Sequence, residues 1–308
     1  MNNIICIAGP TASGKTALAA TLAKELNGEV VSCDSMQVYK HMDIGTAKPT
    51  LEEMQGIPHH MIDVAEPWED FSVSRYCDMA APIVDDIISR GKTAVIAGGT
   101  GLYMDALIRG NAFAPFPATG VRERLEAQAD AEGMEAMLSR LRAVDPDAAR
   151  RLHLSDRKRI LRALEVYLET GETITQHDHR TRQQPPRYRA AYIGLSFQDR
   201  AQLRRRIDLR VDQMMEQDLL NEAKHVWEHR DTYKTAAQAI GYKEFFPYFT
   251  GESALAPCVE KLKQASRNYA KRQLTWFRHM EGICWLDASA PDVREQAACL
   301  TNEFLAKG

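Results

Sequence analysis

A glycine-rich segment near the start of the chain has the residue types of a phosphate-binding loop. The segment Gly9-Pro10-Thr11-Ala12-Ser13-Gly14-Lys15-Thr16 matches the pattern G-x-x-x-x-G-K-[ST]. Glycines let the backbone turn so that several N–H groups point at one anion, and the start of a following helix adds partial positive charge. Lys15 adds a full charge, and the Thr16 hydroxyl suits Mg²⁺. The segment predicts a bound polyphosphate, and it leaves open whether that ligand is ATP, another nucleotide or a different diphosphate.

The flanking elements give this loop the context that it requires. The apolar run Ile4–Ala8 predicts a strand before it, and the amphipathic run Ala17–Leu26 predicts a helix after it. A second strand is expected at Val30–Cys33, so that Asp34 follows its carboxyl end. Because ligands of open parallel sheets bind at that edge, Asp34 to Gln37 should face the ligand of the loop. A helix cap or turn residue is the alternative role for Asp34.

A second junction of strand, glycines and helix follows at Gly98–Gly101. The buried run Thr93–Ala97 predicts the strand, and Leu102–Ile108 predicts the helix. Two such junctions on one sheet edge can hold two ends of a ligand. Thr100 could face that ligand and could also cap the helix.

The segments between these junctions give weaker signals. A short helix is expected at Leu51–Gln55, a strand at Met61–Val64, and a helix at Phe71–Ser89 that Ser72 or Ser74 caps. The adjacent histidines 59 and 60 would point to opposite faces of an extended segment, which favours structural hydrogen bonds over a shared metal ion.

The composition and the expected secondary structure of the chain change after Gly110. The Pro- and Phe-rich run Asn111–Pro117 reads as a linker, and His177–Tyr188 reads as a polar linker back to the core. Helices are expected between them, at Val121–Ala131, Gly133–Ala143 and Ser155–Thr170, with a turn at Asp145-Pro146. A strand at Ala190–Leu195 then resumes the core, followed by helices at Asp199–Glu216, Leu219–His229 and Pro257–Met280 and a last strand at Ile283–Leu286. We therefore predict a P-loop core (residues 1–112 and 190–308) interrupted by a helical insertion (113–189).

Two helices of this second part carry basic surfaces. In the helix at 155–170, Ile160, Leu161, Leu164 and Leu168 form an apolar face opposite Lys158, Arg159 and Arg162. The run Lys271–Arg278 interleaves basic and aromatic residues, which suits phosphates and stacked bases, or a helix packed through its apolar side chains.

Composition limits the classes of protein that the chain can represent. The 308 residues carry a net charge of −3, but residues 150–210 hold 15 basic against 7 acidic side chains. Such an excess is typical of a nucleic-acid surface or of a solvated helix face. No apolar run approaches the ~20 residues of a membrane span, and the six cysteines are scattered. We expect reduced thiols and a cytoplasmic monomer without a membrane segment.

Four functions can be considered for a chain with this loop and these basic surfaces. A nucleoside or nucleotide kinase fits the size, but no apolar strand ends in an obvious second Asp for Mg²⁺. A GTPase or ATPase switch is weakly supported, because the chain has no guanine-reading N-K-x-D motif. The phosphate loop argues against a non-catalytic RNA-binding protein. The fourth is a transferase that takes a diphosphate ester in the loop and an RNA on the basic surfaces.

The last function agrees with a resemblance. Six segments resemble the bacterial tRNA dimethylallyltransferase family, in order along the chain: Gly9–Thr16, Asp34–Tyr39, Met42–Pro49, Gly98–Thr100 with Leu102-Tyr103, Arg162–Val166 and Lys271–Arg278. The resemblance implies an α/β fold, with a P-loop NTPase-like parallel sheet and a helical insertion. It implies transfer of a dimethylallyl group from dimethylallyl diphosphate to N6 of the adenosine 3′ of the tRNA anticodon, with release of diphosphate and with Mg²⁺ as the metal.

The resemblance also implies roles for individual residues. Asp34 would be the general base, Thr100 would lie where the two substrates meet, and Arg206 would lie beside the diphosphate. The diphosphate would be held by Gly9, Pro10, Thr11, Ala12, Ser13, Gly14, Lys15 and Thr16, with Mg²⁺ on Thr16. The anticodon stem-loop would contact Asp34, Ser35, Met36, Gln37, Thr100, Arg122, Lys158, Arg159, Ile160, Leu161, Arg162, Gln238, Ala239, Ile240, Gly241, Tyr242, Lys243, Lys271, Arg272, Gln273, Leu274, Thr275, Trp276, Phe277 and Arg278.

Overall fold

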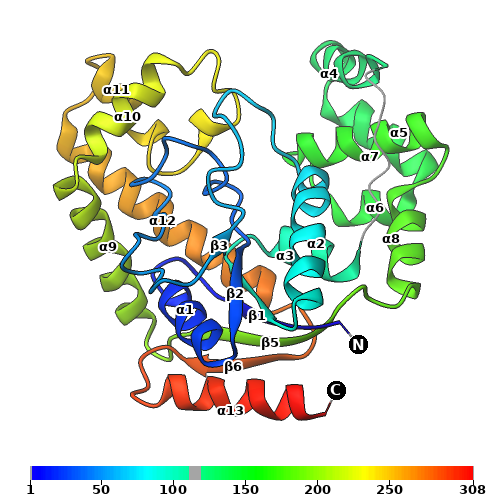
Figure 1. Cartoon of the computed structure of the whole chain (residues 1–308). Coiled ribbons are helices and arrows are strands. Elements are labelled where there is room, and N and C mark those ends of the chain that lie inside the picture. Colours follow the sequence, from blue (N-terminus) through cyan, green and yellow to red (C-terminus); the bar gives the residue numbers. More distant parts are fainter. Residues whose placement is uncertain (1, 111–118, 308) are drawn as a thin grey trace. The chain divides into compact units, whose positions relative to one another are not determined.

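The structure is a computed structural model that describes residues 2–110 and 119–307. These residues form two compact units, one made of residues 1–110 and 187–308 and the other of residues 111–186 (Figure 1). The linker expected at Asn111–Pro117, with the boundary expected after residue 112, lies outside the described residues. Each unit has its own hydrophobic core.

The first unit is built on a parallel sheet of six strands. In chain order the strands are β1 (Asn3–Ala8), β2 (Gly28–Ser32), β3 (His59–His60), β4 (Thr93–Gly98), β5 (Arg189–Ser196) and β6 (Ile283–Asp287). Their order across the sheet is β3-β2-β4-β1-β5-β6. This arrangement confirms the predicted α/β fold with a P-loop NTPase-like parallel sheet, and it brings the carboxyl ends of β1, β2 and β4 to one edge.

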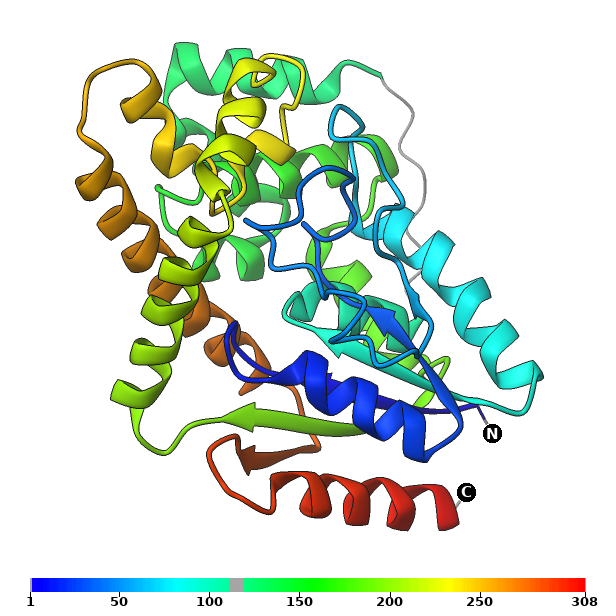
Figure 2. The ribbon, with the colours of Figure 1, turned by 60° about the vertical axis from the view of Figure 1, so that its left-hand side comes forward.

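Helices cover the sheet on both faces. Helix α1 (Lys15–Glu25) and helix α13 (Val293–Ala306) share one apolar cluster with alternate strand residues such as Ile5 and Ile7 (Figure 2). Residues Ile4 and Cys6, which alternate with them, are also fully buried. Helices α2 (Val73–Ser89) and α3 (Gly101–Arg109) pack together on the face of the sheet to which Ile4 and Cys6 point, through the stacked rings of Tyr76 and Tyr103. Continuous apolar strands of this kind are typical of parallel sheets.

The rest of the first unit is helical. It comprises α9 (Arg200–Glu216), α10 (Leu219–Glu228), the 3₁₀ turns Ala236–Gln238 and Lys243–Phe245, α11 (Phe246–Phe249) and α12 (Leu255–Phe277). Helices α9 and α12 lie side by side, in yellow-green and orange in Figure 1. Across the described ranges, no helix combines the length and apolar character that a membrane span requires.

The second unit contains five helices among its described residues. They are α4 (Val121–Glu132), α5 (Met134–Val144), α6 (Pro146–Arg151), α7 (Arg157–Thr170) and α8 (Ile174–Gln183). Side chains such as Leu125, Met137, Leu141 and Leu164 form the core. Buried Asp145 caps α6 through Ala148 N (3.0 Å) and binds the Thr175 hydroxyl (2.7 Å), which ties α6 to α8.

Four expectations about local structure were wrong. Residues 51–55 form turns, and residues 61–63 form bends, because Met61 and Asp63 have positive φ values that interrupt an extended chain. The expected linker 177–188 contains most of α8, which a capping box between Thr173 and Gln176 starts. Leu168 is 58% exposed, so it lies outside the apolar face of α7.

Two other expectations about local structure were confirmed. Ser72 caps α2 by accepting a hydrogen bond from Arg75 N. The two histidines have separate partners, since His59 Nδ1 lies 2.9 Å from Ile57 O and His60 Nε2 lies 2.8 Å from the Glu29 carboxylate.

Candidate active site

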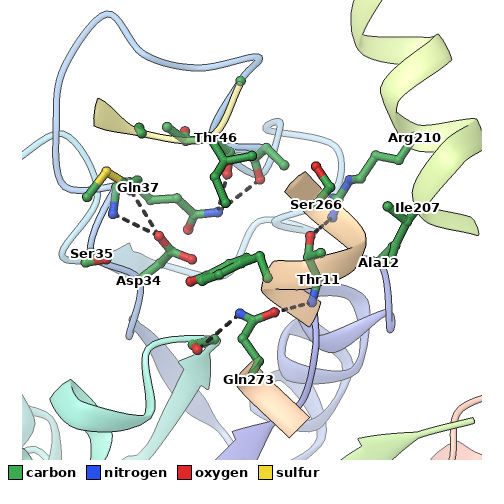
Figure 3. Close-up of a pocket in the computed structure, with 18 of the residues that line it drawn as sticks. Thr11, Ala12, Asp34, Ser35, Gln37, Thr46, Ile207, Arg210, Ser266 and Gln273 are labelled. Carbon is green, nitrogen blue, oxygen red and sulfur yellow. Dashed lines mark hydrogen bonds between the residues drawn. The ribbon is translucent and has the colours of Figure 1, made fainter. Parts of the chain in front are cut away.

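A pocket of about 340 Å³ opens at the carboxyl edge of the sheet. Its walls come from the P-loop, the segments after β2 and β4, the loop at residues 45–47, and helices α9 and α12 (Figure 3). This is the edge at which open parallel sheets bind ligands. Residues far apart in sequence therefore meet around one cavity.

The P-loop has the backbone geometry of an anion site. Gly14 has φ +89° and precedes the first turn of α1, so the free N–H groups of that turn face the loop. Gly9 has φ +154°, and a Cβ there would lie 2.8 Å from Leu195 O, so the chain approaches β5 too closely for a side chain. The buried Ser13 hydroxyl has no hydrogen-bond partner among the described residues. A phosphate oxygen would satisfy these donors.

Lys15 lies inside this loop. Its Nζ donates a hydrogen bond to Pro10 O at 2.6 Å. Burial and the nearby charge of Arg210 together lower the pKa of Lys15 to about 7, although Asp34 opposes both effects. An incoming diphosphate would stabilise the charged form, so the site gains a cation when its ligand binds.

Asp34 stabilises a local turn with one carboxylate oxygen and leaves the other without a hydrogen bond from the described residues. Its Oδ1 accepts hydrogen bonds from the backbone N–H groups of Met36 (2.9 Å) and Gln37 (3.4 Å), which is the turn role that its sequence position allows. Its Oδ2 accepts none from the described residues, and Asp34 lines the pocket. Burial raises the pKa of Asp34, although both backbone hydrogen bonds and the charges of Lys15 and Arg210 lower it. The carboxylate is therefore a better proton acceptor than an exposed one.

Thr100 positions the segment that carries Asp34. Its Oγ1 accepts a hydrogen bond from Ser35 N at 3.0 Å, whereas its side chain makes no cap bond to α3. The expectation that the Thr100 side chain caps α3 is therefore wrong. The neighbouring Gly98 needs to be small, since a Cβ there would lie 2.0 Å from Cys33 O.

The arginines of α9 divide differently from the expectation. Arg206 is exposed, and its Nε donates to Ala12 O at 2.9 Å, so it braces the P-loop from outside. Arg210, one turn further along α9, lines the pocket and reaches Thr11 Oγ1 at 3.4 Å. Burial lowers the pKa of Arg210. Their spacing of four residues puts both arginines on one face of α9.

Glu222 on α10 organises one wall of the pocket, and nothing in the sequence pattern marked it. Its carboxylate accepts hydrogen bonds from the backbone N–H groups of Asp43 (2.8 Å), Ile44 (3.0 Å) and Gly45 (2.9 Å), and from the Tyr242 hydroxyl (2.8 Å). A Cβ on Gly45 would lie 2.6 Å from the Tyr242 ring. One side chain thus joins the loop that provides Gly45 to the turn that contains Tyr242.

The residues expected to contact RNA fall into three groups. Gln238, Ala239, Ile240, Lys243, Arg272 and Gln273 line the pocket with Asp34 to Gln37, and so do Ser266 and Tyr269, which sequence reasoning missed. Phe277 and Tyr242 are fully buried, whereas Trp276 is 41% exposed. In the second unit Lys158, Arg159 and Arg162 are exposed, Ile160 and Leu161 belong to its core, and Arg122 pairs with Glu126 and Glu165.

Comparison with known proteins identifies relatives along the whole chain. A sequence model of the family described as IPP transferase matches residues 37–280. The tRNA dimethylallyltransferase of Acetivibrio thermocellus is 44% identical over 308 residues, covering 99% of this chain and 98% of the relative. That of Caldanaerobacter subterraneus is 46% identical over 285 residues, covering 92% and 90%.

Solved structures of similar proteins also superpose on this chain. The tRNA isopentenylpyrophosphate transferase of Bacillus halodurans superposes with a TM-score of 0.74 at 41% identity, covering all of this chain and 97% of the other. A eukaryotic dimethylallyltransferase acting on tRNA superposes with a TM-score of 0.85 at 32% identity, covering 99% of this chain and 80% of the other.

Proposed function

The chain belongs to the IPP transferase family of tRNA dimethylallyltransferases, and from this premise we propose how it transfers a dimethylallyl group to tRNA. The donor in this proposal is dimethylallyl diphosphate, and the acceptor is N6 of the adenosine 3′ of the anticodon. The observation that carries it is a free carboxylate oxygen, Asp34 Oδ2, in the same pocket as the P-loop. We place the reaction in the cytoplasm, where tRNA is found, and assign it to a monomer.

The diphosphate of the donor fits the P-loop. Backbone N–H groups of residues 12–16, the charge of Lys15 and the guanidinium of Arg210 would bind its oxygens. Thr16 gives the pocket a hydroxyl, an oxygen donor that suits Mg²⁺. Thr16 would hold the ion, which neutralises charge on the diphosphate when it is bound.

The acceptor is activated by one proton transfer. The bond between C1 of the dimethylallyl group and its diphosphate oxygen breaks, and diphosphate leaves with the electron pair. The N6–C1 bond forms, and the N6 proton moves to Asp34 Oδ2. A positioned base of this kind is worth ~10²–10⁴-fold in rate. Thr100 keeps the Asp34 segment in place through Ser35 N.

The RNA must present an unstacked adenine to this pocket. Extruding a base costs a few kcal/mol, and contacts between basic side chains and phosphates offset that cost. These contacts are assigned to the basic side chains of the predicted RNA segments, which are Lys243 and Arg272 of the pocket wall, Lys271 and Arg278, and the exposed Lys158, Arg159 and Arg162 of the second unit.

Label transfer tests the function directly. Purified protein with Mg²⁺, unmodified tRNA and labelled dimethylallyl diphosphate should place the label on N6 of one adenosine, and a tRNA with that adenosine replaced should stay unlabelled. ATP-dependent phosphorylation of a nucleoside would support the kinase alternative, which the relatives do not favour.

The role of Asp34 has its own test. Since burial raises the pKa of Asp34 above the usual value, kcat/KM should fall as the pH drops through that raised pKa. Asp34→Asn should lower transfer at least 100-fold while the tRNA affinity changes no more than about threefold. A variant rate within tenfold of the parent rate would remove Asp34 as the base.

A further inference from the structure

A second cavity, of about 590 Å³, lies between helices α9 and α12, outside the pocket in which we place the chemical step. Arg200 and Arg204 of α9 are four residues apart and line one side of it. Lys271 of α12 and Arg278, which follows the helix, line it too. Ile207 lines both this cavity and the pocket, so the two adjoin. We refer to the second cavity as the α9–α12 groove.

The charges in the groove are not balanced. Five of its lining residues are basic, and Asp208 is the single acid. Asp208 is already paired with the fifth cation, Arg267, at 2.5 Å. The other four have no acidic partner in the part of the chain that the structure describes. Arg205, on the same helix, contrasts with them because it pairs with Asp199. Four unpaired cations around one cavity attract an anion.

The length of the groove favours a chain of phosphates over a single anion. Arg200 and Arg204 are separated by ~6 Å along α9, and Lys271 and Arg278 by ~10 Å at a helical rise of 1.5 Å per residue. The four cations are thus spread along two helices and do not gather at one point. Ser196, Asn268 and Thr275 add neutral hydrogen-bonding groups to the same walls. Such a row of cations and neutral donors suits successive phosphates of a nucleic-acid backbone.

We propose that the α9–α12 groove binds the sugar–phosphate backbone of the tRNA substrate, with Arg200 and Arg204 of α9 as phosphate contacts that no motif indicated. The proposal rests on tRNA as the acceptor of the proposed function. These contacts carry no sequence information, so they contribute affinity and register, whereas the pocket selects the base. The groove adjoins the pocket through Ile207, so one RNA strand can occupy both.

Salt dependence tests the proposal. Filter binding of unmodified tRNA across a salt series compares the parent with Arg200→Ala/Arg204→Ala. If each arginine neutralises one phosphate, the slope of log K against log salt should become shallower by about 1.4–1.8. At low salt the Kd and the KM for tRNA should rise about tenfold, while the KM for dimethylallyl diphosphate and the kcat at saturating tRNA stay within twofold.

Arg205→Ala is the matched control, because Arg205 is exposed on α9 but does not line the groove. It should change the slope by less than about 0.3. An unchanged slope in the double variant would overturn the proposal. So would a double variant that binds tRNA normally but loses affinity for inorganic diphosphate, since the groove would then hold a free anion. Because binding is measured without transfer, a parent that binds tRNA but labels none contradicts the proposed function and not the groove.

Discussion

The side-chain amide of Gln273 accepts a hydrogen bond from the backbone N–H of Thr11 at 2.8 Å (Figure 3). Its Nε2 donates to Gly99 O at 3.1 Å, and the side chain is buried. Gly99 must stay small, because a Cβ there would lie 2.0 Å from that nitrogen. One amide on α12 thus connects the P-loop to the glycine junction after β4, and it fixes the distance between these two segments.

Replacing this amide should impair both folding and catalysis. Gln273→Leu keeps the volume but leaves the Thr11 N–H and the Gly99 carbonyl without a partner, which costs ~1–3 kcal/mol for each buried group. We expect kcat/KM for dimethylallyl diphosphate to fall about 10- to 100-fold. Gln296→Leu, at an exposed amide of α13, should leave it unchanged. A lower melting temperature with unchanged kinetics would show that Gln273 only packs.

Ligand binding should change the protonation of Lys15. Its pKa of about 7 means that the free protein loses this charge as the pH rises through neutrality, whereas a bound diphosphate favours the charged amine. At about pH 8 the binding of dimethylallyl diphosphate should therefore take up close to one proton, and Lys15→Met should take up none. Calorimetry in two buffers of different ionisation enthalpy measures this number. No uptake by the parent would mean that Lys15 is already charged.

The parts of the site that the sequence predicted are those that short local sequence motifs determine. The loop at residues 9–16, Asp34 and Gly98–Gly101 each follow a strand directly, so the parallel sheet alone brings them to one edge. Arg210 and Glu222 depend instead on how α9 and α10 pack back over that edge, and no periodicity within either helix contains that information. Arg206 contacts the P-loop through Ala12 O, and its predicted place beside the diphosphate stays a prediction.

Glu222 should control the mobility of one pocket wall. In Glu222→Gln the amide replaces one acceptor oxygen with a donor, so some of the N–H groups of residues 43–45 lose their partner. Their hydrogen exchange should accelerate at least tenfold, while amides of β1 stay protected. Tyr242→Phe removes only one of the four bonds and should have a smaller effect.

The control for this experiment is Glu228→Gln on the same helix, whose carboxylate lies 3.9 Å from Lys224. It should leave the exchange of residues 43–45 unchanged. If Glu222→Gln exchanges like the parent, the loop is held by other contacts, such as those of Gln37 with Thr46 O and Ala47 O.

The exposed cations of the second unit should contribute to RNA affinity independently of the α9–α12 groove. Lys158 and Arg159 lie on the solvent side of α7, next to the buried Ile160. Lys158→Ala/Arg159→Ala should make the salt slope of tRNA binding shallower by about 1.4–1.8, with little change in melting temperature. Arg150→Ala, at an exposed arginine of α6 paired with Asp147, is the matched control.

Combining these changes with Arg200→Ala/Arg204→Ala tests whether the two surfaces act on one RNA. The two sets of side chains belong to different units and share no partners, so their effects on binding free energy should add within about 0.5 kcal/mol. The salt slope of the quadruple variant should then be shallower than that of the parent by about 2.8–3.6. If the quadruple variant matched either double variant, the surfaces would not bind phosphates of the same tRNA at the same time. One of the two assignments would then be wrong.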